Sequence, residues 1–143
     1  MKVLIFGLPG SGKTTLATSF ADLINGVHIN ADTVRTTYND WDFTLEGRIR
    51  QAQRMRHLSD GVVMAGKIAV ADFVCPTETA RKEFAPDFTI WMDTIKEGRF
   101  KDTNALFETP DNVDYHVSKW FNDTHEALLP VINRYMGRDY SGL

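Results

Sequence analysis

The sequence has little of what covalent cross-links, metal clusters or membrane spans require. Its 143 residues include one cysteine, Cys75, so the chain can form no intrachain disulfide and has no cysteine cluster for zinc. No apolar run approaches the ~20 residues that cross a bilayer. The apolar stretch 1–6 ends in a glycine-rich turn and not in a signal-peptide cleavage site. We therefore expect a soluble, cytoplasmic protein whose mature chain starts at Met1.

An excess of charge of one sign is also lacking. Lys and Arg number 16 and Asp and Glu number 19, which gives a formal net charge of −3. A slightly acidic chain argues against duplex nucleic acid as a partner. Hydrophobic residues make up 43% and charged residues 24% of the chain, which excludes a disordered tail, a coiled coil or a collagen-like repeat. This length can bury a core, so one domain over residues 1–143 is expected.

Short apolar segments alternate with longer amphipathic ones. Strands are predicted at residues 2–6, 27–30, 68–74, 88–92 and 113–117. Helices are predicted at residues 13–24, 45–66, 77–84 and 122–136, the last kinked by Pro130 and ended by Gly137. The alternation predicts an α/β fold with a mostly parallel, five-stranded sheet covered on both faces. Ligands of such sheets bind at the carboxyl ends of the strands, which here are Phe6, Asn30, Val70 and Met92.

The turn after the first predicted strand carries a phosphate-binding motif. Residues 7–14, GLPGSGKT, match G-x-x-x-x-G-K-[ST] in full, between a predicted strand and a predicted helix. Glycines let the backbone N–H groups turn toward phosphate oxygens, and the helix start adds its positive dipole end. Lys13 is expected to reach the β- and γ-phosphates, and the Thr14 hydroxyl to ligate Mg²⁺. The predicted ATP-binding residues are Gly7, Pro9, Gly10, Ser11, Gly12, Lys13, Thr14 and Thr15.

Two aspartates compete for roles near this loop. Asp32 follows the second predicted strand, where an acid can accept a hydrogen bond from an attacking hydroxyl or hold a metal-bound water. The same residue is typical of a helix N-cap, and both roles can hold together. Asp72 follows an apolar run, as does the aspartate that holds Mg²⁺ in many P-loop enzymes; its alternative is the start of a turn. Thr14 and Asp72 are the predicted metal ligands, with Asp32 as the rival of Asp72.

Four further segments match one pattern in order and spacing. INADTVR at 29–35 is similar to L-D-G-D-x-x-R, and FTLEGR at 43–48 is similar to F-S-E-E-D-R. FVCP at 73–76 is similar to F-I-S-P, and FKDTNALFETP at 100–110 to F-T-G-I-D-x-P-Y-E-x-P. On these segments the chain resembles the adenylylsulfate kinases from about Lys2 to Val117. The resemblance implies a P-loop NTPase fold, a three-layer α/β/α sandwich of the nucleoside-monophosphate-kinase kind.

The resemblance also implies a reaction. The γ-phosphate of ATP would pass to the ribose 3′-hydroxyl of adenosine 5′-phosphosulfate, giving PAPS and ADP, with Asp32 orienting or deprotonating that hydroxyl. Phe43 and Phe100 match an aromatic pair that clamps the adenine, and Arg35 and Arg48 match arginines that hold the phosphosulfate. The substrate-binding residues so implied are Asp32, Arg35, Phe43, Arg48, Gln51 and Phe100, where Gln51 replaces the usual Asn. Related kinases often pair, so a homodimer is also implied.

The chain departs from the family pattern in its lid. A segment on the order of twenty residues is missing before Phe100, which leaves a reduced lid at about 95–109. Arg99 and Lys101 are its cations expected to assist Lys13 at the transferring phosphoryl group. Loss of a lid leaves two other readings open. One is a kinase for another acceptor, such as a nucleotide, a small metabolite or a nucleic-acid end, and the other is a non-enzymatic NTP-binding regulatory module.

The remaining substitutions and charged positions have simple structural interpretations. Asp72 stands where the family usually has Ser, and Cys75 also replaces a Ser, most simply as a small core residue. Arg50 and Arg54 are expected on a solvated helix face. The four histidines show no metal-like spacing and are expected to be structural.

Overall fold

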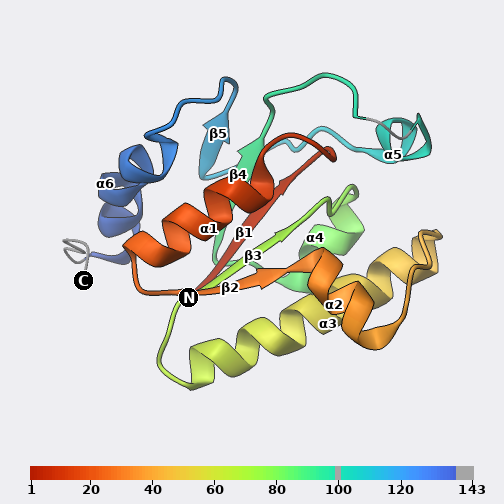
Figure 1. The fold of residues 1–143 in the computed structure, drawn as a ribbon, viewed down its shortest axis with the longest axis horizontal. Coiled ribbons are helices and arrows are strands. Elements are labelled where there is room, and N and C mark those ends of the chain that lie inside the picture. Colours follow the sequence, from red (N-terminus) through yellow and green to blue (C-terminus); the bar gives the residue numbers. More distant parts are fainter. Residues whose placement is uncertain (99–100, 138–143) are drawn as a thin grey trace.

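The computed structural model describes residues 1–98 and 101–137. Within them one sheet has the strand order β2-β3-β1-β4-β5, and each pairing is parallel (Figure 1). The strands are β1 (Lys2–Gly7), β2 (Val27–Asn30), β3 (Ala69–Phe73), β4 (Phe88–Met92) and β5 (Tyr115–Val117). The helices are α1 (Lys13–Leu23), α2 (Ala31–Tyr38), α3 (Leu45–Met64), α4 (Glu78–Phe84), α5 (Lys101–Leu106) and α6 (Thr124–Met136).

Two apolar layers hold the helices against the sheet. Successive residues of a strand point to opposite faces, so Val3 and Ile5 of β1 join a core with α1 and α6, while Leu4 and Phe6 join a core with α2, α3 and α4. Figure 1 shows these two groups of helices on opposite sides of the sheet. The structure confirms the predicted three-layer α/β/α sandwich with its five-stranded parallel sheet.

The predicted elements are present with their ends shifted by a few residues, but α2 and α5 were not predicted. Helix α2 begins because the Asn30 side chain accepts from the backbone N–H of Thr33 at 3.1 Å. Asn30, not Asp32, is therefore its N-cap, and the prediction that Asp32 caps a helix is wrong. Pro130 lies inside α6, and Gly137 follows α6 as a left-handed C-cap, as predicted.

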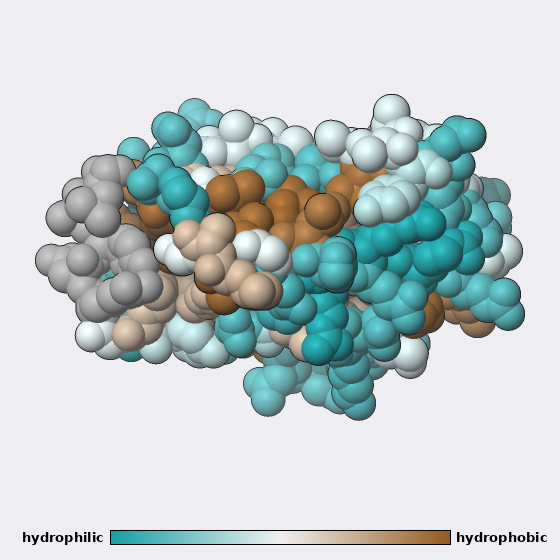
Figure 2. Space-filling view, turned by 90° about the horizontal axis from the view of Figure 1, so that it is seen from below, coloured by the Kyte–Doolittle hydropathy of each residue, from teal (hydrophilic) through white to brown (hydrophobic). Residues whose placement is uncertain are grey.

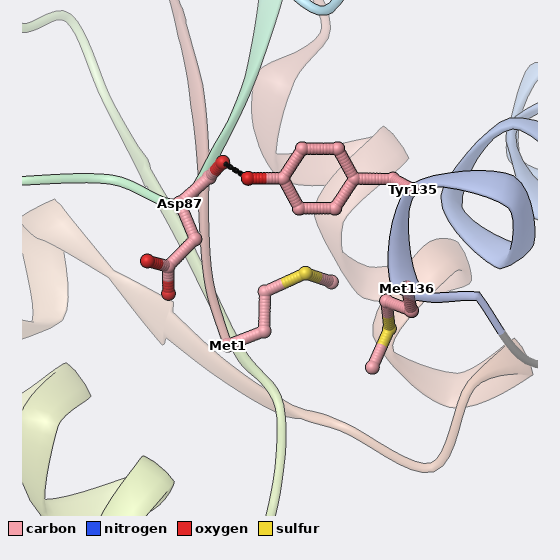
Figure 3. A pocket seen from close by; sticks show the side chains of 4 residues that line it. All are labelled: Met1, Asp87, Tyr135 and Met136. Atoms are coloured by element: carbon pink, nitrogen blue, oxygen red, sulfur yellow. Dashed lines mark hydrogen bonds between the residues drawn. The ribbon is translucent and has the colours of Figure 1, made fainter.

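The amino ends of the strands lie away from the glycine-rich turn. A shallow hollow of about 390 Å³ is lined there by Met1, Asp87, Tyr135 and Met136, with the Tyr135 hydroxyl donating to the Asp87 carbonyl (Figure 3). The Asp87 carboxylate accepts the backbone N–H of Lys2 at 2.7 Å. This hollow therefore lies at the opposite end of β1 from the turn.

The surface seen in Figure 2, from below the view of Figure 1, carries an apolar band beside a broad hydrophilic area. No helix within residues 1–98 and 101–137 is both long enough and apolar enough to cross a lipid bilayer.

Candidate active site

The turn between β1 and α1 has the backbone that its motif requires. Gly10 and Gly12 have φ values of 86° and 95°, which side chains of L residues rarely adopt. A Cβ on Gly7 would lie 2.4 Å from the carbonyl oxygen of Met92, so only glycine fits where β1 runs beside β4. Because α1 begins at Lys13, the turn leads its backbone N–H groups directly into a helix N-terminus, an arrangement suited to phosphate.

Two segments brace this turn from outside. Thr94 Oγ1 donates to the carbonyl of Ser11 at 2.7 Å, and a Cβ on Gly98 would lie 3.2 Å from Pro9. The ring of Trp120 lies close to Gly12, at 3.4 Å from the position of a Cβ there. Sequence reasoning missed Trp120, because nothing in its local pattern links the segment after β5 to the turn after β1.

Lys13 lies over the turn and is almost fully enclosed. Its side-chain ammonium donates to the carbonyl of Leu8 at 3.0 Å, and the residue is 9% exposed. Burial lowers the pKa of Lys13 to about 8, although the carboxylates of Asp72 and Asp32 act to raise it. The predicted cation and both predicted acids are therefore close enough to interact.

Asp72 is buried inside β3, so the alternative that it begins a turn is wrong. Thr14 Oγ1 donates to its Oδ1 at 3.1 Å. Asn30 Nδ2 lies 3.4 and 3.3 Å from its two oxygens, and His28 Nε2 contacts Oδ2. The structure thus brings both predicted metal ligands together.

The donor set at this point is a hydroxyl and a carboxylate, which are hard oxygen ligands of the kind that suit Mg²⁺. Among residues 1–98 and 101–137, no group of three or more His, Cys, Asp or Glu side chains could hold a metal. A cation here would therefore need the oxygens of a bound phosphate to complete its shell, as Mg²⁺ commonly does.

Asp32 lies at the start of α2 and is exposed. Its charge acts on the pKa of Lys13 and also on that of Arg35. Asp32 is therefore within electrostatic range of both Lys13 and Arg35, and its role toward an acceptor hydroxyl stays a prediction.

A second cationic group joins three of the predicted substrate-binding residues. The guanidinium carbons of Arg35 and Arg48 lie 4.3 and 5.4 Å from the ring centroid of Phe43, which is itself 53% exposed. Arg35 donates to the carbonyls of Asp40 and Asp42 at 3.0 and 3.2 Å. Arg48 donates to the carbonyl of Phe43 at 2.9 Å.

Both guanidinium groups are hydrogen-bonded to backbone carbonyls. Burial lowers the pKa of both, and the charge of Arg48 further lowers the pKa of Arg35, although the carboxylates of Asp40, Asp32 and Asp42 act to raise it. Within the described part of the chain, neither makes an ion pair with a carboxylate. Arg35 is 5% exposed and Arg48 is partly buried, and these two adjacent cations beside an exposed aromatic ring are of a chemistry that suits an anionic ligand with a flat ring.

The family model of adenylylsulphate kinase matches residues 1–94. The chain belongs to the adenylylsulphate kinase family. It is 39% identical over 85 residues to a probable adenylyl-sulfate kinase of Aeropyrum pernix, a match that covers 55% of this chain and 46% of that protein. The match thus spans about half the length of this curated relative.

Solved structures agree on the fold. The crystal structure of APE1195 is 25% identical with a TM-score of 0.72, covering 95% of this chain and 93% of that one. The Mycobacterium tuberculosis APS kinase CysC in complex with AMPPNP and APS is 17% identical with a TM-score of 0.73, covering 92% and 96%. Shikimate kinase of Aquifex aeolicus shares the fold at 14% identity and a TM-score of 0.65, covering 96% and 99%.

Gln51, which replaces the family's usual Asn, has a contact that sequence reasoning did not anticipate. It is 3% exposed and donates to the carbonyl of Ala31 at 3.0 Å, while its Oε1 has no hydrogen-bond partner among the described residues. Gln51 therefore ties α3 to the start of α2 beside Asp32. Its contact with substrate stays a prediction.

The segment 95–109, predicted to be a reduced lid, contains helix α5. Arg48 Nη2 donates to Thr103 of α5 at 3.3 Å, and the Asn104 side chain bonds both backbone groups of Gly98, at 2.8 and 3.1 Å. Lys101 begins α5 and is exposed, and no contact places it at the phosphate-binding turn. Arg99 and Phe100, the other predicted lid residues, lie outside the described residues.

Arg50 lies on a solvated face as expected, with its side chain 41% exposed, and Arg54 is more enclosed at 24%, but both form ion pairs that were not expected. Arg50 donates to Asp40 at 2.7 and 3.1 Å and to Asp42 at 3.0 Å, and Arg54 donates to Asp40 at 2.5 Å. The hydrogen bonds from Arg50 and Arg54 hold the pKa of Asp40 well below its usual range. These contacts fasten the irregular segment 39–44, which carries Phe43, to α3.

The lowered pKa of Lys13 predicts proton uptake on nucleotide binding. A polyphosphate beside Lys13 favours the ammonium form and raises its pKa from about 8. Above pH 8 the free protein has lost part of this proton, so MgATP binding takes up a proton and affinity falls as pH rises. Calorimetry above that pH, in two buffers of different ionisation enthalpy, measures the uptake.

A Lys13→Met variant has no titratable amine and serves as the control, since it should show no uptake from this position. Identical binding heats in the two buffers for the native protein would contradict the assignment of the lowered pKa to Lys13.

The ion pairs of Asp40 with Arg50 and Arg54 predict that Asp40→Ala makes the segment 39–44 open more often. Backbone amides there should exchange with deuterium about tenfold faster or more, because charge-assisted hydrogen bonds to Arg50 and Arg54 are lost. Amides of β1 should be unchanged. Glu46→Ala, at an exposed position in the first turn of α3, is the matched control. Unchanged exchange in the Asp40 variant would show that the ion pairs do not hold the segment.

Proposed function

We propose that the chain is an ATP-dependent adenylylsulfate kinase that phosphorylates the 3′-hydroxyl of adenosine 5′-phosphosulfate and releases PAPS and ADP. The observation that carries the proposal is the pair Arg35 and Arg48, two guanidinium groups that lie on the exposed ring of Phe43 and form no ion pair with a carboxylate of the described residues. Membership of the adenylylsulphate kinase family supports the same acceptor.

The phosphate-binding turn takes the triphosphate of ATP. Its residues, including Ser11 with its buried and unpartnered hydroxyl, surround the start of α1. Lys13 neutralises the charge of the β- and γ-phosphates. Thr14 and Asp72 would hold the Mg²⁺ that accompanies the nucleotide, and this ion would supply charge neutralisation at the phosphates.

The acceptor lies on the other side of Asp32. Arg35 and Arg48 bind the phosphosulfate, and Phe43 offers its ring to the adenine. Asp32 accepts the hydrogen bond of the 3′-hydroxyl and orients its oxygen toward the γ-phosphorus. Because the transition state of phosphoryl transfer is loose, positioning and charge neutralisation contribute more to the rate than removal of the proton.

The remaining cations of the proposal lie in the segment 95–109. Arg99 and Lys101 are proposed to approach the transferring phosphoryl group when both substrates are bound, since the third cation of this segment already faces a carboxylate. Lys96, in the same segment, lies 3.5 Å from Asp93. A homodimer is proposed on the family resemblance alone.

A panel of acceptors tests the function. With ATP labelled at the γ-phosphate, label should pass to adenosine 5′-phosphosulfate in preference to shikimate, gluconate, a nucleoside monophosphate or a 5′-hydroxyl oligonucleotide. Arg48→Ala should raise the KM for the phosphosulfate by roughly tenfold to a hundredfold, the loss of a charge-assisted contact, with the KM for ATP little changed. Arg56→Ala, on an exposed part of α3, is the control and should behave as the native protein.

Transfer to another acceptor but not to adenosine 5′-phosphosulfate would assign the chain a different substrate on the same fold. Tight nucleotide binding with no transfer to any compound offered would favour the non-enzymatic NTP-binding reading.

A further inference from the structure

A ring of side chains links β2, β3 and the first turns of α1. His28 and Asn30 are two residues apart on β2 and so point to the same face. Asp72 is paired with Asn30 across the strands, on that same face. Thr14 and Thr18 are four residues apart on α1, one turn above each other. The sequence pattern of the two strands and the helix thus brings these five side chains together.

The hydrogen bonds of this ring close on themselves. Thr14 Oγ1 donates to Asp72 Oδ1 at 3.1 Å. Asp72 Oδ2 contacts His28 Nε2, and His28 Nδ1 lies 3.5 Å from Thr18 Oγ1. Thr18 Oγ1 donates back to the carbonyl of Thr14 at 2.8 Å. The same threonine therefore stands at both ends of the chain of contacts.

Burial makes the His28 contact important for Asp72. The side chain of Asp72 is 3% exposed and that of His28 is 20% exposed. An ionised carboxylate only accepts hydrogen bonds, so Nε2 of His28 donates to Oδ2. Asn30 Nδ2 reaches both oxygens at longer distances of 3.3 and 3.4 Å and does not by itself choose between them. His28 thereby fixes the rotation of the carboxylate about its Cβ–Cγ bond.

We propose that His28 is a positioning residue which holds the Asp72 carboxylate so that Oδ1, with the Thr14 hydroxyl, faces the divalent cation of the bound nucleotide. This inference rests on the proposed function, in which Thr14 and Asp72 hold that cation. His28 itself does not touch the cation. It acts as the hydrogen-bonding partners of metal ligands commonly do, by orienting the ligand.

The pair His28 and Asp72 sets this chain apart from the family pattern. Asp72 stands where the resemblance places Ser, so an ionic ligand has been introduced into a buried strand. A buried carboxylate needs donors to be tolerated. His28, expected from the sequence to be merely structural, supplies the donor on the side of Asp72 that Thr14 does not occupy.

Three substitutions of His28 separate positioning from packing. His28→Gln keeps a nitrogen donor with the reach of Nε2, His28→Asn keeps the polarity but is too short, and His28→Leu keeps volume without a donor. Binding of Mn²⁺ to the complex of protein and ATP, followed by electron paramagnetic resonance, is the main readout. Binding of ATP in the presence of EDTA is the second, because it does not depend on the metal. His57→Leu, on the exposed surface of α3, is the matched control.

We expect the Asn and Leu variants to bind Mn²⁺ about tenfold more weakly than the native complex, the usual size of the loss when a partner of a metal ligand is removed. His28→Gln should stay close to native, and metal-free ATP binding should change less than about twofold in all variants, since none alters the phosphate-binding turn. If His28→Leu does not fold, the comparison of Gln with Asn carries the same test.

Equal Mn²⁺ affinity in the native, Gln and Asn proteins would overturn the positioning role of His28. A parallel loss of Mn²⁺ binding and metal-free ATP binding would overturn it as well, because that pattern reports general damage. If the native chain binds no nucleotide at all, the proposed function fails first. If the native chain binds MnATP and transfers phosphate while the variants match it, the failure belongs to this inference alone.

Discussion

The absence of side chains at three glycines is the constraint on which the site depends. Gly7 lets β1 end directly beside the carbonyl of Met92 on β4, and Gly10 and Gly12 take backbone angles that bend the chain into α1. A side chain at Gly7 would push β1 and β4 apart at the edge where Lys13, Asp32 and Asp72 meet. The same glycines therefore allow both the close approach of β1 to β4 and the bend of the turn that is proposed to accept a polyphosphate.

Charge is distributed across this edge in an order that suits phosphoryl transfer. Lys13 and Thr14 lie on the side of the phosphate-binding turn, and Arg35 and Arg48 lie on the side of Phe43. Asp32, exposed at the start of α2, acts on the pKa of Lys13 from the first group and of Arg35 from the second. The proposed function uses this distribution, with the donor phosphates at the first cationic group, the acceptor at the second and Asp32 toward the acceptor hydroxyl.

Much of this could be predicted from the sequence, because the signals are local or repeat along the chain. The strand-turn-helix context of GLPGSGKT and the alternation of apolar segments predicted the sandwich and the phosphate-binding turn. Helices α2 and α5 were not predicted because they are short and show no helical periodicity of apolar residues. Helix α2 depends on the N-cap at Asn30 and on the hydrogen bond from Gln51 to the carbonyl of Ala31.

Contacts between distant segments could not be predicted. The ion pairs of Asp40 with Arg50 and Arg54 join positions ten and fourteen residues apart across an irregular segment, and their register has no sequence signal. The approach of Trp120 to Gly12 depends on the strand order, which places β5 next to β4 and brings the segment after β5 to the same edge. The family resemblance predicted that Arg35, Phe43 and Arg48 bind substrate, but only the structure shows that the two arginines lie against the ring of Phe43.

Calorimetric titration with MgATP, repeated with inorganic tripolyphosphate, tests the central claim most directly. The account predicts saturable binding of both ligands in competition with each other, and its loss in a Gly12→Val variant that retains the native melting temperature, because a side chain at the φ of 95° and against Trp120 disturbs the turn. Absence of saturable heat with either ligand in the native protein would contradict the claim that this turn binds a polyphosphate.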